Sequence, residues 1–190
     1  MDVLPFKTMF KPLQIHSGKI SICSIDDAFA IEFYDKIRSQ PDSLSVFFPT
    51  LIFNTKTLRK TLAFFEKRRK EWANKESCAC LILVENEIAG YISVMRFHHF
   101  VKELELGYLI FEEYKNKGFA TQALRLFSDY FLEDLKMKKV LVRIAEENLS
   151  SKKVATNAGF VFKELKKNDF KVEGEYWIPT EHWVKSSKRL

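Results

Sequence analysis

The segment between Glu103 and Leu135 constrains the fold most, because within it one glycine joins a strand pattern to a helix pattern. Residues 103–111 (ELELGYLIF) are apolar and aromatic over the length of a strand. After Gly118, apolar residues recur at the i, i+3, i+4 and i+7 spacing of a helix with one buried face. The pattern predicts a tight strand-to-helix turn at Gly118, in a chain with only 6 glycines among 190 residues.

This turn has the chemistry of an anion-binding site. The first backbone N–H groups of a helix have no partners within it, and the helix dipole adds partial positive charge there. Lys115 and Lys117 add full charges, and phosphate commonly binds such a helix end. The segment matches neither the Walker A loop nor the dinucleotide-binding fingerprint. From these residues alone, a phosphate site and a plain turn with two solvated lysines remain equal alternatives.

The rest of the chain predicts a mixed α/β order without repeats or linkers. Residues 39–55 carry Pro41 and Pro49 and are expected to form a long loop or a broken helix. Asn86-Glu87 is expected to be the turn of a hairpin. Strands are expected at 19–26, 77–85, 88–97, 103–111, 138–146, 160–167 and 175–185, and helices at 26–38, 56–74, 118–135 and 150–158.

Composition excludes several classes of protein. No apolar run approaches the length of a membrane span, and the first 16 residues do not resemble a secretory signal. The three cysteines indicate buried reduced thiols and a cytoplasmic protein, and Cys78 and Cys80 should share one strand face. They lack the additional ligands of a metal site, so no metal is expected. The net charge of +6 suits an anionic partner without identifying one.

Three motifs in order resemble the GNAT superfamily of acetyl-CoA-dependent N-acetyltransferases. The central motif, Gln/Arg-x-x-Gly-x-Gly/Ala, corresponds to Lys115–Ala120 (KNKGFA). The longer run ELGYLIFEEYKNKGFATQAL (105–124) and NLSS (148–151) ahead of Gly159-Phe160 are most similar to the branch of ribosomal-protein alanine N-acetyltransferases. The resemblance covers residues 15–185. It implies one N-acetyltransferase domain over 1–190, with a mostly antiparallel sheet of six to seven strands flanked by helices.

The resemblance also implies the residues that bind acetyl-CoA. The Gly118 turn would surround the pyrophosphate. The strand from Tyr108 to Ile110 would pair its backbone with the pantetheine arm, a β-bulge in that strand opening the slot, and an N–H near Leu109 would bind the oxyanion. Asn148 would contact the cofactor, although a helix cap alone could explain it. The implied set is Tyr108, Leu109, Ile110, Lys115, Asn116, Lys117, Gly118, Phe119, Ala120, Thr121, Asn148 and Ser151.

The catalytic residues are harder to assign, because the chain departs from the common pattern. Lys115 replaces a Gln or Arg, Glu112 a Pro, and Ala155 the Tyr that serves many members as general acid. Spacing from Asn148 favours Ser151 as the substitute acid, and a helix start is its structural alternative. Glu105 is the first candidate base, equally open to a structural role, and Asp169 is the second.

The expected activity is direct acetyl transfer to a primary amine in a ternary complex. The first hypothesis is a protein N-terminal amine, such as that of a ribosomal protein. The alternatives are a small amine (a polyamine, amino acid or antibiotic) and a non-catalytic acyl-CoA-binding module. Residues 44–54 and 169–175 would frame the acceptor groove. No direct nucleic-acid or membrane partner is expected, and the protein is expected to be a monomer or homodimer.

Overall fold

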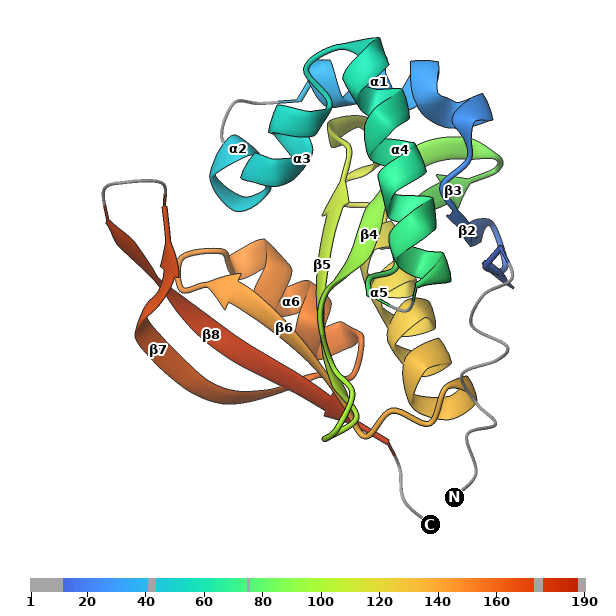
Figure 1. Ribbon diagram of the computed structural model, residues 1–190. Helices are drawn as coiled ribbons and strands as arrows, with labels where there is room; N and C mark the ends of the chain where they lie inside the picture. The colour runs from blue at the N-terminus through green and yellow to red at the C-terminus, as the bar shows by residue number, and fades with distance from the viewer. Residues whose placement is uncertain (1–11, 41–43, 75, 173–175, 188–190) are drawn as a thin grey trace.

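A computed structural model describes residues 12–40, 44–74, 76–172 and 176–187 and arranges them on one eight-stranded sheet (Figure 1). Across the sheet the order is β1-β2-β3-β4-β5-β6-β8-β7. Neighbouring strands are antiparallel, except β5 and β6, which run parallel. The strands are β1 (Gln14–Ser17), β2 (Ile20–Ser24), β3 (Ala79–Val84), β4 (Glu87–His98), β5 (Glu103–Ile110), β6 (Lys139–Ala145), β7 (Val161–Lys171) and β8 (Trp177–Ser186).

The mixed, mostly antiparallel sheet expected from the sequence is confirmed, with eight strands instead of six or seven. The additional strand is β1, whose four residues QIHS contain one apolar residue, Ile15, and are too short to show alternation. Its pairing with β2 defines it as a strand. The predicted hairpin between β3 and β4 is also present, but its turn is Glu85-Asn86, one residue earlier than expected. Both turn residues have positive φ, 52° and 74°, as tight hairpin turns require.

Helices cover both faces of the sheet (Figure 1). α1, α3 and α4 pack on one face, and α5, η4 and α6 pack on the other. α5 also supplies the crossover that parallel strands β5 and β6 need. The helices are η2 (Asp27–Phe29), α1 (Ala30–Arg38), α2 (Leu44–Phe47), α3 (Pro49–Asn54), α4 (Leu58–Ala73), η3 (Glu112–Tyr114), α5 (Phe119–Asp129), the π-helical turn η4 (Tyr130–Asp134) and α6 (Leu149–Asn157).

The helix boundaries follow ordinary capping chemistry. The side chains of Asp26, Thr57 and Asn148 each accept a backbone N–H at the start of a helix. Pro49 occupies the first turn of α3, where its missing N–H costs nothing. The expected broken helix is therefore confirmed as α2 and α3. None of the helices in the described ranges is long and apolar enough to cross a membrane.

Two apolar clusters, one on each face of the sheet, hold the layers together. Phenylalanine dominates both: Phe33, Phe65 and Phe111 are fully buried in one, and Phe127 and Phe131 in the other. A fully buried side chain of this size contributes roughly 1.5–3 kcal/mol. Cys78 and Cys80 share one strand face as expected, with their Sγ atoms 3.8 Å apart in the core.

The sheet opens between β5 and β6. These strands pair over only four residues, Glu103–Leu106 against Lys139–Val142. On the other side of β5, the register with β4 shifts between Val94 and Arg96, so Met95 is the extra residue of a bulge. The bulge thus lies in β4, not in the Tyr108–Ile110 strand as expected. Gly107 fits against it, because a Cβ there would stand 3.1 Å from the Met95 sulfur.

Candidate functional site

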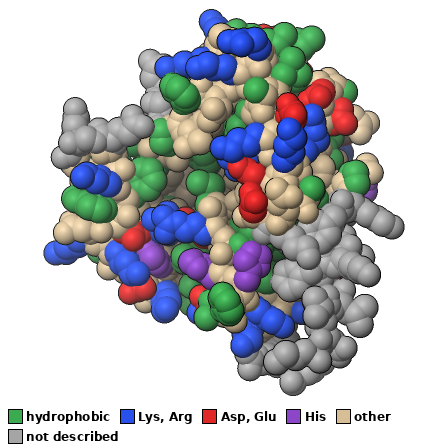
Figure 2. Space-filling model, in the orientation of Figure 1, with side chains coloured by type: hydrophobic (Ala, Val, Ile, Leu, Met, Phe, Trp, Pro, Cys, Tyr) green, Lys and Arg blue, Asp and Glu red, His purple; other side chains and the backbone are tan. Residues whose placement is uncertain are grey.

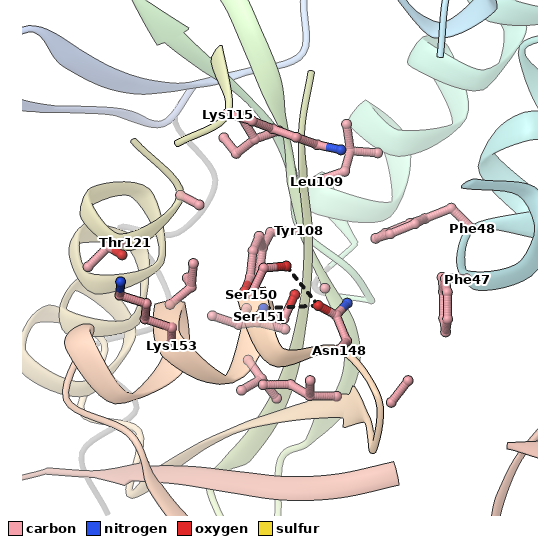
Figure 3. A pocket seen from close by; sticks show the side chains of 18 of the residues that line it. Phe47, Phe48, Tyr108, Leu109, Lys115, Thr121, Asn148, Ser150, Ser151 and Lys153 are labelled. Carbon is pink, nitrogen blue, oxygen red and sulfur yellow. Dashed lines mark hydrogen bonds between the residues drawn. The ribbon is translucent and has the colours of Figure 1, made fainter. Parts of the chain in front are cut away.

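A cavity of about 600 Å³ occupies the opening between β5 and β6. Figure 2 shows this face of the molecule hollowed between the helices above and the C-terminal strands below. Its walls come from β5, β6, α2, the first turns of α5 and α6, and single residues of β7 and β8. Figure 3 shows Lys153 and Thr121 at one end and Phe47 and Phe48 at the other. The cavity is a passage with a polar end and an apolar end.

The Gly118 turn forms the polar end. Gly118 has φ +79° and precedes α5 without any side-chain cap, so the first N–H groups of the helix remain available. A Cβ at Gly118 would have only the Gln122 side chain nearby, at 3.9 Å. Asn116 also has positive φ, 60°, which gives the turn two left-handed residues. The backbone is therefore shaped to present donors to an anion.

The lysines near this turn differ in their positions. Lys115 lines the cavity and is ion-paired with Glu112. Lys117 lies outside the cavity lining and donates to the Glu113 carbonyl at 2.7 Å. Lys153 of α6 lines the same cavity, although no sequence motif had indicated it. Of the lysines near this turn, Lys115 and Lys153 therefore line the cavity, and Lys115 is already ion-paired.

The α6 N-terminus lies between the two ends. Asn148 is its N-cap: Oδ1 accepts the Ser151 N–H at 3.0 Å and the Ser150 hydroxyl at 2.9 Å (Figure 3). Both bonds use the oxygen, so the amide nitrogen remains for a ligand. Asn148, Ser150 and Ser151 all line the cavity. Capping and ligand contact are thus compatible at Asn148.

β5 contributes its free edge. The Phe111 N–H donates to the Ala89 carbonyl of the β4 side at 2.9 Å. Because hydrogen-bonded pairs alternate along antiparallel strands, the N–H groups of Tyr108 and Ile110 point away from β4, toward the gap. Leu109, between them, directs its backbone to β4 and its side chain into the core. A ligand chain along the gap can extend the sheet through Tyr108 and Ile110.

A buried charge cluster lies at the base of the cavity. Arg143 Nε donates to Glu105 Oε1 at 2.8 Å, and Arg143 Nη1 lies 3.4 Å from Asp169 Oδ2. Asp169 Oδ2 also accepts from the Thr180 hydroxyl and lies 2.8 Å from His182 Nε2. The two carboxylates that the sequence suggested as separate base candidates therefore share one guanidinium.

The two carboxylates differ in their freedom to accept a proton. Burial alone would raise the pKa of Asp169, but hydrogen bonds from Thr180 and His182 and the charge of Arg143 outweigh it and lower the pKa to about 2. Glu105 lines the cavity; its hydrogen bond with Arg143 uses the Oε1 atom, and its Oε2 atom lies 4.0 Å from Arg96 Nε. Glu105 Oε2 is thus the freer acceptor.

Sequence reasoning missed Thr180, His182 and, most importantly, Arg143, which joins the two carboxylates of this cluster. Arg143 is the one charged residue in the apolar run from Val140 to Ala145 of β6, and that signal was present in the sequence. Its partner Asp169 lies 26 residues further along the chain. No local pattern could have joined them.

Aromatic side chains form the apolar end. Phe47 of α2, Phe48 at the start of α3 and Phe170 of β7 line it, with Met95 from the β4 bulge. The ring centroids of Phe47 and Phe170 lie 6.3 Å apart, so α2 and β7 face each other across this end. Both segments expected to frame an acceptor groove contribute here, although residues 173–175 lie outside the described ranges. No group of side chains in the described ranges is arranged to hold a metal ion.

Of the residues expected from sequence, Glu105, Tyr108–Ile110, Lys115, Asn116, Gly118–Thr121, Asn148 and Ser151 line this one cavity, and Lys117 does not. The arrangement suits an elongated ligand with an anionic group at the Gly118 turn and a main-chain-like arm along β5. Its far end would lie beside Ser151 and Glu105, where a second molecule entering from the aromatic side could meet it.

A family model described as an acetyltransferase (GNAT) domain matches residues 22–161. The chain is 28% identical over 91 residues to the ribosomal-protein-serine acetyltransferase of Escherichia coli (strain K12), covering 47% of this chain and 51% of that protein. It is 27% identical over 92 residues to spermidine N(1)-acetyltransferase of the same strain, covering 48% and 50%. The alignments thus span about half the length of these curated relatives.

Among solved structures, the ribosomal-protein α-N-acetyltransferase RimL in complex with coenzyme A has the same fold. Its TM-score is 0.82 at 15% identity, covering 92% of this chain and 98% of that chain.

Proposed function

Because the chain belongs to the acetyltransferase (GNAT) domain family, we propose that it transfers an acetyl group from acetyl-CoA to the α-amine of a protein N-terminus. One observation carries the proposal: a single cavity joins the uncapped Gly118 turn, the free edge of β5 and an aromatic end. The first two parts fit a phosphate-bearing cofactor with an amide-containing arm, and the third fits a chain-like acceptor.

The residues divide the work of holding acetyl-CoA. The N–H groups from Asn116 to Thr121, with Lys115 and Lys153, bind the pyrophosphate region. The backbone of Tyr108–Ile110 pairs with the pantetheine arm. The Asn148 amide and the Ser151 hydroxyl contact the arm near the reacting end, and Lys117 contributes only longer-range charge.

Glu105 then prepares the acceptor. Its Oε2 atom accepts a proton from the incoming amine, because a protonated amine has no lone pair with which to attack. A backbone N–H turned toward the gap, that of Tyr108 or Ile110, stabilises the oxyanion that develops on the carbonyl oxygen. Attack is direct, because Cys23 does not line the cavity and Cys78 and Cys80 lie in the core. The thioester supplies the activated acetyl group.

The charges of the cavity favour a peptide over a polyamine. Glu105 and Glu112 are the carboxylates among its described lining residues, and each is already ion-paired. Their partners are Arg143 and Lys115, so Lys153 is the one unbalanced charge among the described lining residues and leaves the lining slightly positive. A polycation would meet repulsion there, whereas a peptide N-terminus can place its first side chains against Phe47 and Phe170.

Incubation with acetyl-CoA and a mixed panel, followed by mass spectrometry, tests the proposal. The panel should contain ribosomal-protein N-terminal peptides, the same peptides with blocked α-amines, spermidine and free amino acids. We expect acetylation of free peptide N-termini only. Preferential acetylation of spermidine would support the small-amine alternative. Tight coenzyme A binding without acetylation of any acceptor would support a non-catalytic module.

We expect Gly118→Val to lower coenzyme A affinity by at least about tenfold. A β-branched residue disfavours φ +79° and places atoms where the phosphate must approach. Calorimetry of the folded variant measures the change. Gly18→Val is the matched control, because Gly18 has φ +58° with open space around it and is not among the residues that line the cavity. Equal affinities for the two variants would contradict the assignment of the turn.

We expect Asn148→Ala to raise the KM for acetyl-CoA severalfold while lowering the free energy of unfolding by about 1 kcal/mol, as the loss of a helix cap does. Thr57→Ala is the control, since Thr57 caps α4 through the Lys60 N–H at 3.2 Å, away from the cavity. Steady-state kinetics and urea unfolding of both variants separate the two roles. An Asn148→Ala enzyme with reduced stability and an unchanged KM would leave Asn148 with capping alone.

A further inference from the structure

The hydroxyl of Tyr108 is a buried polar group without a hydrogen-bond partner of good geometry. Tyr108 lines the cavity, and in the described ranges its Oη atom makes no hydrogen bond within the usual distance and angle, although the Ser151 side chain is near enough to act weakly on it. Leaving a buried hydroxyl unpaired costs about 1–3 kcal/mol, and such groups are rare in native proteins. Replacing the hydroxyl by hydrogen would remove that cost. Its presence in a ligand cavity therefore indicates a partner supplied by the ligand.

The position of this hydroxyl identifies the part of the cavity that it serves. Tyr108 lies beside the start of α6, close to Ser151 (Figure 3). Ser151 and Ala155 are one turn apart and therefore lie on the same face of α6. Ala155 is fully buried in the cluster against which the Tyr108 ring packs. The small Ala155 side chain thus belongs to the apolar cluster that supports the Tyr108 ring, while Ser151 of the same helix lines the cavity beside it.

We propose that the Tyr108 hydroxyl donates a hydrogen bond to the sulfur of the bound cofactor and stabilises the thiolate as it leaves. The proposal rests on the acetyl-CoA site described above. It assigns this contact to a residue of β5, and it makes Ser151 the neighbour of the donor.

The chemistry balances without proton transfer from Tyr108. The amine nitrogen forms a bond to the acetyl carbon, the C–S bond breaks, and its electron pair moves to sulfur. Glu105 accepts one proton from the ammonium group before attack and passes it to solvent, and the second proton leaves the nitrogen for Glu105 or water after attack; solvent protonates the released thiolate. Burial raises the pKa of Tyr108 to about 12, and the Ser151 side chain opposes the rise by less. The phenol therefore remains a neutral donor throughout the neutral pH range.

A comparison of coenzyme A with desulfo-coenzyme A tests the contact without relying on activity. Above the pKa of the thiol, we expect the unmodified protein to favour coenzyme A, and Tyr108→Phe to reduce this preference by about tenfold, as loss of one charge-assisted hydrogen bond would. The affinity for desulfo-coenzyme A should stay within about twofold. Stability should be unchanged or higher, because the variant removes only an unpaired hydroxyl.

Tyr91→Phe is the matched control. Tyr91 is a buried phenol whose pKa burial also raises to about 12, but it packs on the opposite face of the sheet and outside the cavity. It should leave the preference for coenzyme A unchanged. Equal losses for the two ligands in Tyr108→Phe would place the hydroxyl on another part of the cofactor and overturn the proposal, as would an unchanged preference. If the unmodified protein binds neither ligand, the proposed acetyl-CoA site is wrong. The proposed contact of Tyr108 is then wrong as well.

Discussion

Replacing Arg143 with methionine is expected to lower the free energy of unfolding by about 3–5 kcal/mol, the usual result of removing one partner from a buried ion pair. The side chains of Glu105 and Arg143 are 8% and 15% exposed, and Asp169 is 17% exposed, so little water is available to replace the guanidinium. Without it, two carboxylates would face each other at the base of the cavity. Urea unfolding at neutral pH measures the change.

Lys139→Met is the matched control for this prediction. Lys139 and Glu103 also connect β6 to β5, but they are 32% and 36% exposed. Lys139 lies four residues before Arg143 on β6, and Glu103 lies two residues before Glu105 on β5. An exposed pair contributes about 0–1 kcal/mol. If both variants lose similar amounts of stability, burial does not make the Arg143 cluster special.

The same variant should behave differently in acid. The pKa of Asp169 in the folded protein, about 2, lies below its value of about 3.9 in an unfolded chain. A depressed pKa contributes stability that is fully present above the unfolded value and is lost as the pH falls toward the folded value. Because Arg143→Met removes one cause of the depression, the difference in stability between the two proteins should shrink between about pH 4 and pH 2.

Replacing Glu105 with glutamine is expected to lower kcat by roughly 100- to 1000-fold near neutral pH, within the range of general-base contributions. The loss should diminish at high pH, where the acceptor α-amine, with a pKa near 8, deprotonates in solution. A pH–rate profile with an acceptor verified by mass spectrometry tests this, with circular dichroism to confirm folding. Glutamine keeps the size of the side chain and removes its charge.

Two further variants decide between the carboxylates. Glu103→Gln changes a neighbouring carboxylate of β5 outside the cavity lining and should alter kcat by less than about twofold. Asp169→Asn should cost less than Glu105→Gln if Glu105 is the base. A larger loss in Asp169→Asn, with rescue at high pH, would transfer the role to Asp169. An unchanged profile in Glu105→Gln would leave Glu105 with its ion pair alone.

The parts of the fold that could be predicted from sequence are those with local causes. The strand before Gly118, the amphipathic helix after it, the cap at Asn148 and the left-handed Gly159 (φ +90°) all follow from spacing and backbone preference. Local causes also explain the error of one residue at the β3–β4 turn. Asn commonly adopts positive φ, so Asn86 could be recognised as a turn residue. Glu rarely adopts positive φ, so nothing in the sequence identified Glu85 as the other turn residue.

The parts that could not be predicted depend on contacts distant in sequence. The Met95 bulge exists because β4 and β5 run out of register, and the sequence carries no mark of it. Arg143 meets Asp169 only after β7 and β8 join the sheet next to β6. Nor does a tyrosine in a strand reveal that its hydroxyl will lack a partner. The sequence motifs predicted the residues at the polar end of the cavity. The aromatic end and the charge cluster could be recognised only in the folded structure.

The short pairing of β5 with β6 has a mechanical consequence. Four residue pairs form the hydrogen-bonded seam between the strands β1–β5 and the strands β6–β8. Beyond these four pairs, β5 and β6 separate, and so do the two halves of the sheet to which they belong. A ligand that pairs with β5 and also contacts α6 bridges this gap, so it holds the two halves of the sheet together. Because such a ligand binds only when the two halves are in place, its binding should also stabilise their arrangement.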